Sequence, residues 1–441
     1  MSKISRRNFL FTASATTAAT LIVNGCSSSR STNNSTTTSS SPAPSPVAAA
    51  DTPEVTTAKL GFIALTDSAP LIIAKEKGLF AKYGMPDVEV AKQASWAVTR
   101  DNLELGSGSG GIDGAHILTP MPYLMTAGTI TKGGAKVPMN ILARLNVNGQ
   151  GISLSNAYAD LKVGADSSPL KAAFAKGKSE GKDMKCAVTF PGGTHDLWMR
   201  YWLAAGGIDP DKDVSTIVVP PPQMVANIKV NNMEAFCVGE PWPAQTVNQK
   251  IGYTAITTGE LWKNHPEKAL AMRADWVEQN PKAAKAITMA VQEAQIWCDD
   301  PANKEEMCQI VSGRQWFKVP VDDILERSKG NFDLGNGRTL QSSDLLMKFW
   351  NDDASYPFQS HDLWFLTEDI RWGYLPADTD TKALIAAVNR EDIWREAAKA
   401  IGQESAIPKS TSRGVETFFD GTKFDPENPE AYLRSLSIKK A

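Results

Sequence analysis

A short glycine-rich loop offers the clearest binding chemistry in the sequence. Pro191–His195 follow an apolar, strand-like run and open a segment with helical periodicity. Glycines at Gly192 and Gly193 permit backbone N–H groups to face outward, and the N-terminus of a helix favours bound anions. Thr194 can cap this helix, and His195 can direct a ring N–H into the same space. The loop therefore predicts an anion site, but the same residues also suit a plain strand-to-helix corner.

Three further residues offer ligand contacts in loops after predicted strands. Trp96 presents an indole N–H and an apolar face, and Gln150 presents amide donors. Gly239 follows the apolar run 234–238, and a glycine at a strand end permits close approach of the backbone to a ligand. Each residue alone also fits ordinary packing, so the sequence proposes them only as possible parts of one site.

Catalytic chemistry has little support in the sequence. There are four histidines, and the chain has no Gly-x-Ser-x-Gly elbow and no His-Glu-x-x-His motif. The run 106–111 resembles a phosphate loop but lacks the lysine of a P-loop, and Asp113 with His116 fits a polar strand end better than an acid/base pair. We therefore expect no catalytic residue, no cofactor and no metal site.

Composition excludes one class of partner. Lys and Arg number 46 against 49 Asp and Glu, so a net charge of -3 provides no basic field for nucleic acid. At 441 residues and 42% hydrophobic content, the chain can form two or three domains with sizeable cores. Cys186, Cys237, Cys298 and Cys308 show no zinc or Cys-x-x-Cys spacing, so we expect them to be buried structural residues.

The N-terminus predicts export and membrane attachment. Basic residues including Arg6 and Arg7 precede the apolar stretch 9–23, and Ser5–Leu10 fits the twin-arginine export pattern. Val23–Cys26 resembles a lipobox, so we expect residues 1–26 to be a signal that ends at a lipidated Cys26. Residues 27–56 are rich in Ser, Thr and Pro and predict a flexible tether. A surface-held capture protein needs this arrangement of anchor, tether and globular body.

The rest of the chain alternates between strand-like and helix-like segments. Predicted strands are 60–63, 88–90, 111–114, 140–145, 185–190, 216–219 and 234–238. Predicted helices are 69–83, 123–126, 195–205, 223–230 and 281–298. This alternation favours sheets covered by helices on both faces, with ligands beyond the carboxyl ends of the strands. In the last third, Trp350, Trp364, Trp372 and Trp394 are best explained as packing residues.

Several segments resemble a known family. Lys59–Phe62, Ala69–Ala74, Glu76–Phe80 and Lys82–Met85 look like the opening of the nitrate, sulfonate and taurine group of periplasmic binding proteins. The resemblance continues through segments spread over nearly the whole mature chain, namely 111–114, 191–196, 239–243, 265–268 and 413–421. Within that group the chain is similar to the nitrate-binding lipoproteins of cyanobacterial nitrate/nitrite ABC transporters, in the nitrate/bicarbonate solute-binding family.

The resemblance implies an α/β fold, a two-lobed periplasmic-binding-protein clamp that is type II-like and has a long C-terminal extension. Residues 57–150 would form the first part of lobe 1, and residues 151–245 would form lobe 2. Residues 246–441 would return to lobe 1 and then form a helical C-terminal extension that packs on both lobes. The protein would be held by its lipid anchor on the periplasmic side of the inner membrane, without catalytic activity.

The resemblance also implies a nitrate site. Carried over position by position, its ligand-binding residues would be Trp96, Gln150, His195, Gly239 and Lys268, beside the anion loop Gly192, Gly193 and Thr194. Nitrate, and nitrite too, would pass from this site to the permease and ATPase subunits of an ABC transporter. Lys268 would supply the positive charge that a buried monoanion requires. Without the resemblance, Lys268 would be interpreted as a solvated lysine at a helix start.

Two relatives of that family offer alternatives. A bicarbonate-binding relative replaces the Gly-Gly-Thr-His loop and has an acidic residue in place of Lys268, consistent with a co-bound calcium ion. Thiamin-pyrimidine synthases of similar fold are enzymes, but they carry a cysteine-rich cluster that this chain lacks. A sensor domain is a third alternative, although no output module follows the binding region.

Overall fold

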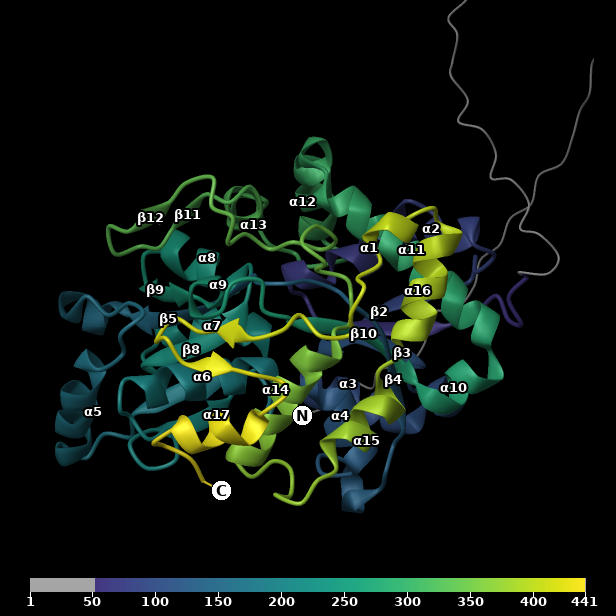
Figure 1. Ribbon diagram of the computed structural model, residues 1–441. Helices are drawn as coiled ribbons and strands as arrows, with labels where there is room; N and C mark the ends of the chain where they lie inside the picture. The colour runs from purple at the N-terminus through teal and green to yellow at the C-terminus, as the bar shows by residue number, and fades with distance from the viewer. Residues whose placement is uncertain (1–51, 441) are drawn as a thin grey trace, which may run out of the picture. The chain divides into compact units, whose positions relative to one another are not determined.

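The computed structural model describes residues 52–440 (Figure 1). The predicted signal, the lipidated Cys26 and residues 27–51 of the predicted tether lie outside this range. Across residues 52–440, no helix combines the length and the apolar character that a membrane span requires.

The first sheet has five strands in the order β2-β1-β3-β10-β4. Its strands are β1 (Lys59–Phe62), β2 (Glu89–Lys92), β3 (Gly114–Leu118), β4 (Met139–Arg144) and β10 (Lys268–Arg273). β1 pairs in parallel with β2 and β3, whereas β10 runs antiparallel between β3 and β4. The helices within this part of the chain are α1 (Ala69–Glu76), α2 (Leu79–Lys82), α3 (Trp96–Leu105), α4 (Pro120–Ala127), α10 (Ala274–Gln279) and α11 (Pro281–Asp299).

The second sheet also has five strands, in the order β7-β6-β8-β5-β9. Its strands are β5 (Gln150–Ser155), β6 (Lys185–Val188), β7 (Ser215–Val218), β8 (Ala235–Gly239) and β9 (Gly252–Thr257). β6, β7 and β8 are parallel, and β5 is antiparallel to both of its neighbours. The accompanying helices are α5 (Pro169–Ser179), α6 (Thr194–Ala205), α7 (Met224–Lys229), α8 (Trp242–Asn248) and α9 (Thr258–Leu261).

The chain crosses between the sheets twice, and one crossing differs from the predicted boundary. The first crossing joins β4 to β5 over residues 145–149. The second joins β9 to β10, and β9 pairs with β5 of the second sheet. The second lobe therefore extends to residue 257, beyond the boundary of 245 expected from the sequence. The sequence did not indicate β5 or β9, because both strands mix apolar residues with Gly, Ser, Thr or Gln and have no continuous apolar run.

The C-terminal extension packs on the hydrophobic cores of both lobes. Its elements are α12 (Lys304–Ser312), α13 (Asp322–Ser328), β11 (Phe332–Asp333), β12 (Thr339–Leu340), α14 (Gln359–Arg371), α15 (Thr381–Val388), α16 (Glu391–Ala400), β13 (Glu416–Thr417), β14 (Lys423–Phe424) and α17 (Pro429–Ser435). Val388 and Trp394 join the core of the first lobe, whereas Trp364 and Phe418 join that of the second. Helix α14 lies between the two lobes, with α4 and α15 on one side and α6 and α17 on the other (Figure 1).

Short 3-10 turns complete the described chain: η2 (Thr66–Ser68), η3 (Ser107–Ser109), η4 (Lys132–Gly134), η5 (Asn156–Leu161), η6 (Pro221–Gln223), η7 (Pro301–Asn303) and η8 (Glu404–Ala406).

The packing role predicted for the late tryptophans is confirmed, because Trp364, Trp372 and Trp394 are buried and Trp350 stacks on Trp394 with ring centroids 5.6 Å apart. The four predicted structural cysteines are likewise buried as free thiols.

Candidate anion-binding site

Buried polar side chains from both sheets meet between the lobes, in what we name the central cluster. Each member is at most 1% exposed, and the cluster consists of Asp67, His116, Gln150, His195, Glu267 and Lys268. Asp67 lies in η2, directly after β1, and His116 lies in β3. Gln150 begins β5, and His195 lies in the first turn of α6. The cluster therefore collects the ends of elements from both lobes, where open α/β sheets place their ligands.

Lys268 lies at the centre of this cluster. Its Nζ is 2.9 Å from Asp67 Oδ2, 2.9 Å from Glu267 Oε1 and 3.4 Å from Gln150 Oε1. Burial disfavours the charged ammonium, but the two carboxylates outweigh burial and raise the pKa of Lys268. Lys268 is the first residue of strand β10 and has no exposed surface. The interpretation as a solvated lysine at a helix start is therefore wrong.

Asp67 is a charged member that the sequence did not single out. Its Oδ1 lies 2.6 Å from His116 Nε2, and His116 Nδ1 accepts the Ile63 backbone N–H at 3.5 Å. Burial favours the neutral acid, but Lys268 and His116 lower the pKa of Asp67 below its usual range. Because its position follows the end of β1, a search for polar residues after strands would have found Asp67.

His195 and Gln150 hold each other in a fixed orientation. Gln150 Nε2 donates to Asp67 Oδ2 at 3.1 Å and to the Asn148 carbonyl at 3.3 Å, so its Oε1 faces the histidine. His195 Nε2 lies 2.7 Å from that oxygen and must carry the proton of this hydrogen bond. The ring's other nitrogen, Nδ1, lies 2.6 Å from Thr189 Oγ1. The pair thus places an imidazole N–H beside the ammonium of Lys268.

The glycine loop differs from the sequence prediction. The Gly192 N–H donates to Asp196 Oδ2 at 2.9 Å, and the Gly193 N–H donates to the Phe190 carbonyl at 3.1 Å. Gly193 is the N-cap of α6, and the hydroxyl of Thr194 donates to Glu267 instead of capping the helix. The expectation that both glycine amides face outward and that Thr194 caps is therefore wrong. Asp196 lies in the first turn of α6, and its carboxylate accepts the Gly192 N–H that was predicted to bind an anion.

Trp96 contributes a buried donor without a partner. The residue is the first of α3 rather than part of a loop, and Ser95 caps that helix by accepting the Val98 N–H. Lys268 Nζ lies 5.9 Å from the centroid of the Trp96 ring. Within residues 52–440, the fully buried Nε1 of Trp96 has no hydrogen-bond partner. An unpaired buried donor normally costs about 1–3 kcal/mol, so this N–H is available to a ligand that accepts a hydrogen bond.

Gly239 brings backbone against the central cluster. A Cβ atom there would lie 2.5 Å from Gln150 Oε1 and 3.2 Å from Asp67 Oδ2. We expect Gly239→Ala to displace the Gln150 amide and to weaken anion binding by at least about tenfold, or 1.4 kcal/mol. Titration calorimetry measures this change. The control is Gly108→Ala, where a Cβ would meet no atom within 4 Å, and equal affinity losses in both variants would contradict the prediction.

The structure therefore brings the five predicted contact residues, Trp96, Gln150, His195, Gly239 and Lys268, around one point. The Lys268 ammonium, the His195 imidazole N–H and the Trp96 indole N–H are hydrogen-bond donors, which suits an anion, whereas Gln150 directs its Oε1 toward the first two. Across the described residues, no group of three or more His, Cys, Asp or Glu side chains is arranged to hold a metal ion. Their role as ligands stays a prediction.

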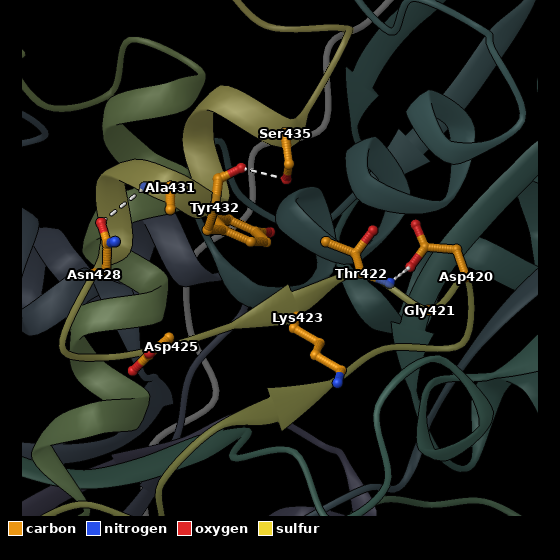
Figure 2. A pocket seen from close by; sticks show the side chains of 9 residues that line it. All are labelled: Asp420, Gly421, Thr422, Lys423, Asp425, Asn428, Ala431, Tyr432 and Ser435. Atoms are coloured by element: carbon orange, nitrogen blue, oxygen red, sulfur yellow. Dashed lines mark hydrogen bonds between the residues drawn. The ribbon is translucent and has the colours of Figure 1, made fainter.

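A separate hollow of about 480 Å³ lies on the C-terminal extension around β14 and α17 (Figure 2). Two of its polar side chains are bonded within the protein: Asp420 Oδ1 accepts the Thr422 N–H at 3.0 Å, and Asn428 Oδ1 accepts the Ala431 N–H at 3.2 Å. The lining belongs to residues 420–435, so this hollow contains no member of the central cluster.

Comparisons with known proteins identify the family of this chain. Residues 51–312 match the model of the NMT1-like family. The chain is 68% identical to the nitrate/nitrite binding protein NrtA of Synechocystis sp., over 99% of this chain and 98% of that one. The crystal structure of the periplasmic nitrate-binding protein NrtA from Synechocystis PCC 6803 is 71% identical and superposes with a TM-score of 0.86, covering 88% of this chain and 100% of that chain.

Two further relatives are a bicarbonate-binding protein and an ATP-binding protein. The bicarbonate-binding protein CmpA of Synechococcus elongatus is 47% identical over 99% of this chain and 99% of its own length. The nitrate import ATP-binding protein NrtC of Synechocystis sp. is 33% identical over 86% of this chain but only 55% of its own length. The expected two-lobed α/β fold is thereby confirmed. The chain belongs to the NMT1-like family and, within it, to the periplasmic nitrate/nitrite-binding proteins represented by NrtA.

Proposed function

We propose that this protein captures nitrate, and nitrite as well, in the central cluster and delivers it to an ABC-type permease. The observation that carries this proposal is the unpartnered indole N–H of Trp96 beside the buried ammonium of Lys268. Support also comes from relatives named for nitrate and nitrite binding at 68% identity.

The chemistry of nitrate suits this set of groups. Nitrate is a planar monoanion that donates no hydrogen bond and accepts only weakly, so a buried site must supply several donors and a positive charge. Lys268 supplies the charge, while His195 and Trp96 supply ring N–H groups; Gln150 Oε1 accepts from His195 and Lys268 and so orients both of them. At Gly239 a side chain would meet Gln150 and Asp67, so the glycine lets the backbone lie close to the polar groups of the site.

Bicarbonate is the second candidate ligand, because CmpA is 47% identical to this chain. One observation disfavours a bicarbonate site that depends on calcium. The ammonium of Lys268 lies 2.9 Å from both buried carboxylates, Asp67 and Glu267, which are the groups that would attract calcium. A divalent cation there would meet the repulsion of the ammonium.

We propose that the protein works outside the cytoplasmic membrane, attached through a lipid on Cys26, and that it binds its ligand without turnover. The likeness to a periplasmic nitrate-binding protein supports the location. The likeness to an ATP-binding protein of nitrate import supports a transporter as the partner. Mass spectrometry of the membrane-associated protein tests the anchor, with diacylglycerol on Cys26 as the expected result and an unmodified Cys26 as the opposite one.

Calorimetric titration of the full-length protein tests the ligand. Nitrate, nitrite and bicarbonate are added separately, with calcium and with a chelator. We expect binding heats for nitrate and nitrite that calcium does not change, and loss of these heats in Lys268→Glu. Calcium-dependent bicarbonate heat without any nitrate heat would refute the proposal.

A further inference from the structure

The charges of the central cluster leave a buried negative charge unmatched. Lys268 is its ammonium, and Asp67 and Glu267 are its two carboxylates. All three side chains have no exposed surface. If both carboxylates are ionised and the histidines are neutral, the cluster carries a net charge of −1. An added nitrate would bring this to −2 in a site without solvent, which burial strongly disfavours.

Asp67 is not the group that takes up a proton to neutralise the extra negative charge of the cluster. His116 Nε2 and Lys268 Nζ both donate to its carboxylate, at 2.6 and 2.9 Å. His116 is itself fixed as the neutral ring, because its Nδ1 accepts a backbone N–H from Ile63. Protonating His116 would force two N–H groups toward each other. Asp67 and Lys268 thus remain a charged pair, and Glu267 carries the unmatched charge.

Groups from several elements face Glu267. The Lys268 ammonium lies on β10, the Thr194 hydroxyl and the Trp198 indole donate from α6, and the indole distance is 2.7 Å. Two histidine rings also face this carboxylate: His195 Nε2 at 3.8 Å and His265 Nδ1 at 3.6 Å. The buried thiol of Cys237 approaches from β8, and burial raises its pKa, so it stays neutral. Burial raises the pKa of Glu267, and although the neighbouring Lys268 lowers it, the net shift is upward.

Both histidines have partners that tolerate a second proton. His195 Nδ1 faces the Thr189 hydroxyl, which can either donate or accept. His265 Nδ1 lies 3.1 Å from the Pro266 carbonyl, and its Nε2 lies 2.7 Å from the Thr258 hydroxyl. Burial lowers the pKa of His265 to about 3, and the nearby Lys268, Arg413 and His361 lower it as well, so His265 gains a proton only when another negative charge arrives. Glu267 and these two rings therefore form one titrating unit, which we name the proton unit.

We propose that the site binds its anion together with one proton, which is held by the proton unit of Glu267, His195 and His265. This inference rests on the proposed function and adds a co-ligand to it. Nitrate is the anion of a strong acid, so the proton stays on the protein. By linkage, the anion raises the proton affinity of the unit, and the proton raises the anion affinity by the same factor.

Titration calorimetry with sodium nitrate, in buffers of different ionisation enthalpy, counts the protons taken up. We expect uptake that approaches one proton for each nitrate at pH 8.5. Since an ionised Glu267 opposes the anion and a protonated one does not, the dissociation constant should rise toward tenfold for each pH unit between pH 7.5 and 9, which is the slope for one proton. Nitrate binding with no proton uptake and a flat pH profile from 6 to 9 would overturn this inference and leave the proposed function standing. If nitrate does not bind at any pH, both fail.

Two variants locate the proton. Glu267→Gln removes the unmatched charge, so we expect its proton uptake to disappear and its pH profile to flatten, with tighter nitrate binding than wild type at pH 9. Because Glu267→Gln could disturb folding, its thermal unfolding is measured alongside, and His265→Gln is a second variant that should reduce the uptake. The matched control is Glu293→Gln, a half-buried carboxylate that pairs with Lys82 at 2.6 Å outside the cluster, which should keep full uptake. Equal uptake in Glu267→Gln, His265→Gln and wild type would overturn the assignment.

Discussion

Replacing Lys268 with methionine is expected to lower the free energy of unfolding by about 3–5 kcal/mol and to abolish nitrate binding. The substitution keeps much of the side chain's volume but leaves the buried carboxylates of Asp67 and Glu267 without their ammonium. It also removes the positive charge that compensates the ligand. Urea unfolding measures the first effect, and titration calorimetry measures the second.

A double variant separates the two effects. Lys268→Met combined with Asp67→Asn removes both members of the buried ion pair, so we expect it to recover part of the lost stability. Nitrate binding should stay absent, because the positive charge is still missing. A single Lys268→Met variant with wild-type stability would show that the ion pairs contribute little, and one with wild-type affinity would remove Lys268 from the site.

Replacing Asp362 with asparagine is expected to cost about 3–5 kcal/mol of unfolding free energy. Asp362 lies in α14 of the C-terminal extension and pairs with Arg144 at the end of β4, and the two side chains are 0% and 1% exposed. Asp362 also accepts the Asn389 side-chain N–H at 2.7 Å. The substitution leaves a buried guanidinium without its counter-charge, at the contact that joins the extension to the first lobe.

Urea unfolding of Asp362→Asn, followed by tryptophan fluorescence, measures this loss. The control is Glu430→Gln, which breaks an exposed pair whose side chains are 67% and 82% accessible and should change stability by less than about 1 kcal/mol. Similar stability losses in the two variants would contradict the buried pair's role. If the extension also fixes the position of one lobe relative to the other, nitrate affinity should fall in Asp362→Asn but not in Glu430→Gln.

Segments with a clear local period were predictable from the sequence. Helix α11 begins at Pro281 and ends at Asp299, one residue beyond its predicted end. Helix α6 and strand β6 also match their predicted positions, because an apolar strand, a glycine turn and a helical repeat follow one another there. The predicted helix 69–83 is instead two helices, since Gly78 adopts φ 68° between them.

Strand β10 could not be predicted from local preference. Its residues, Lys268–Arg273, include Lys, Ala, Leu and Met, which favour helices in isolation. Pairing with β3 on one side and β4 on the other overrides that preference, because all backbone groups of this buried segment must be satisfied. The strand places Lys268 inside the protein, and the residues next to it in the sequence do not indicate this burial.

The site was predictable only in part, for the same reason. Trp96 and His195 lie in the first turns of helices and Gly239 ends a strand, and such positions indicate a ligand edge from the sequence alone. Asp67 and Glu267 gain their importance from residues far away in the sequence, through Lys268 and Trp198. The glycine amides were misjudged because the carboxylate that binds Gly192 comes from the following helix turn.

A crystal structure of the protein grown with nitrate tests whether the anion binds between the two sheets. We predict flat, four-atom density within hydrogen-bond distance of Lys268 Nζ, His195 Nε2 and Trp96 Nε1, against the backbone of Gly239. Nitrate bound elsewhere, with Lys268 still bonded to Asp67 and Glu267 and His195 still bonded to Gln150, would contradict the proposed site.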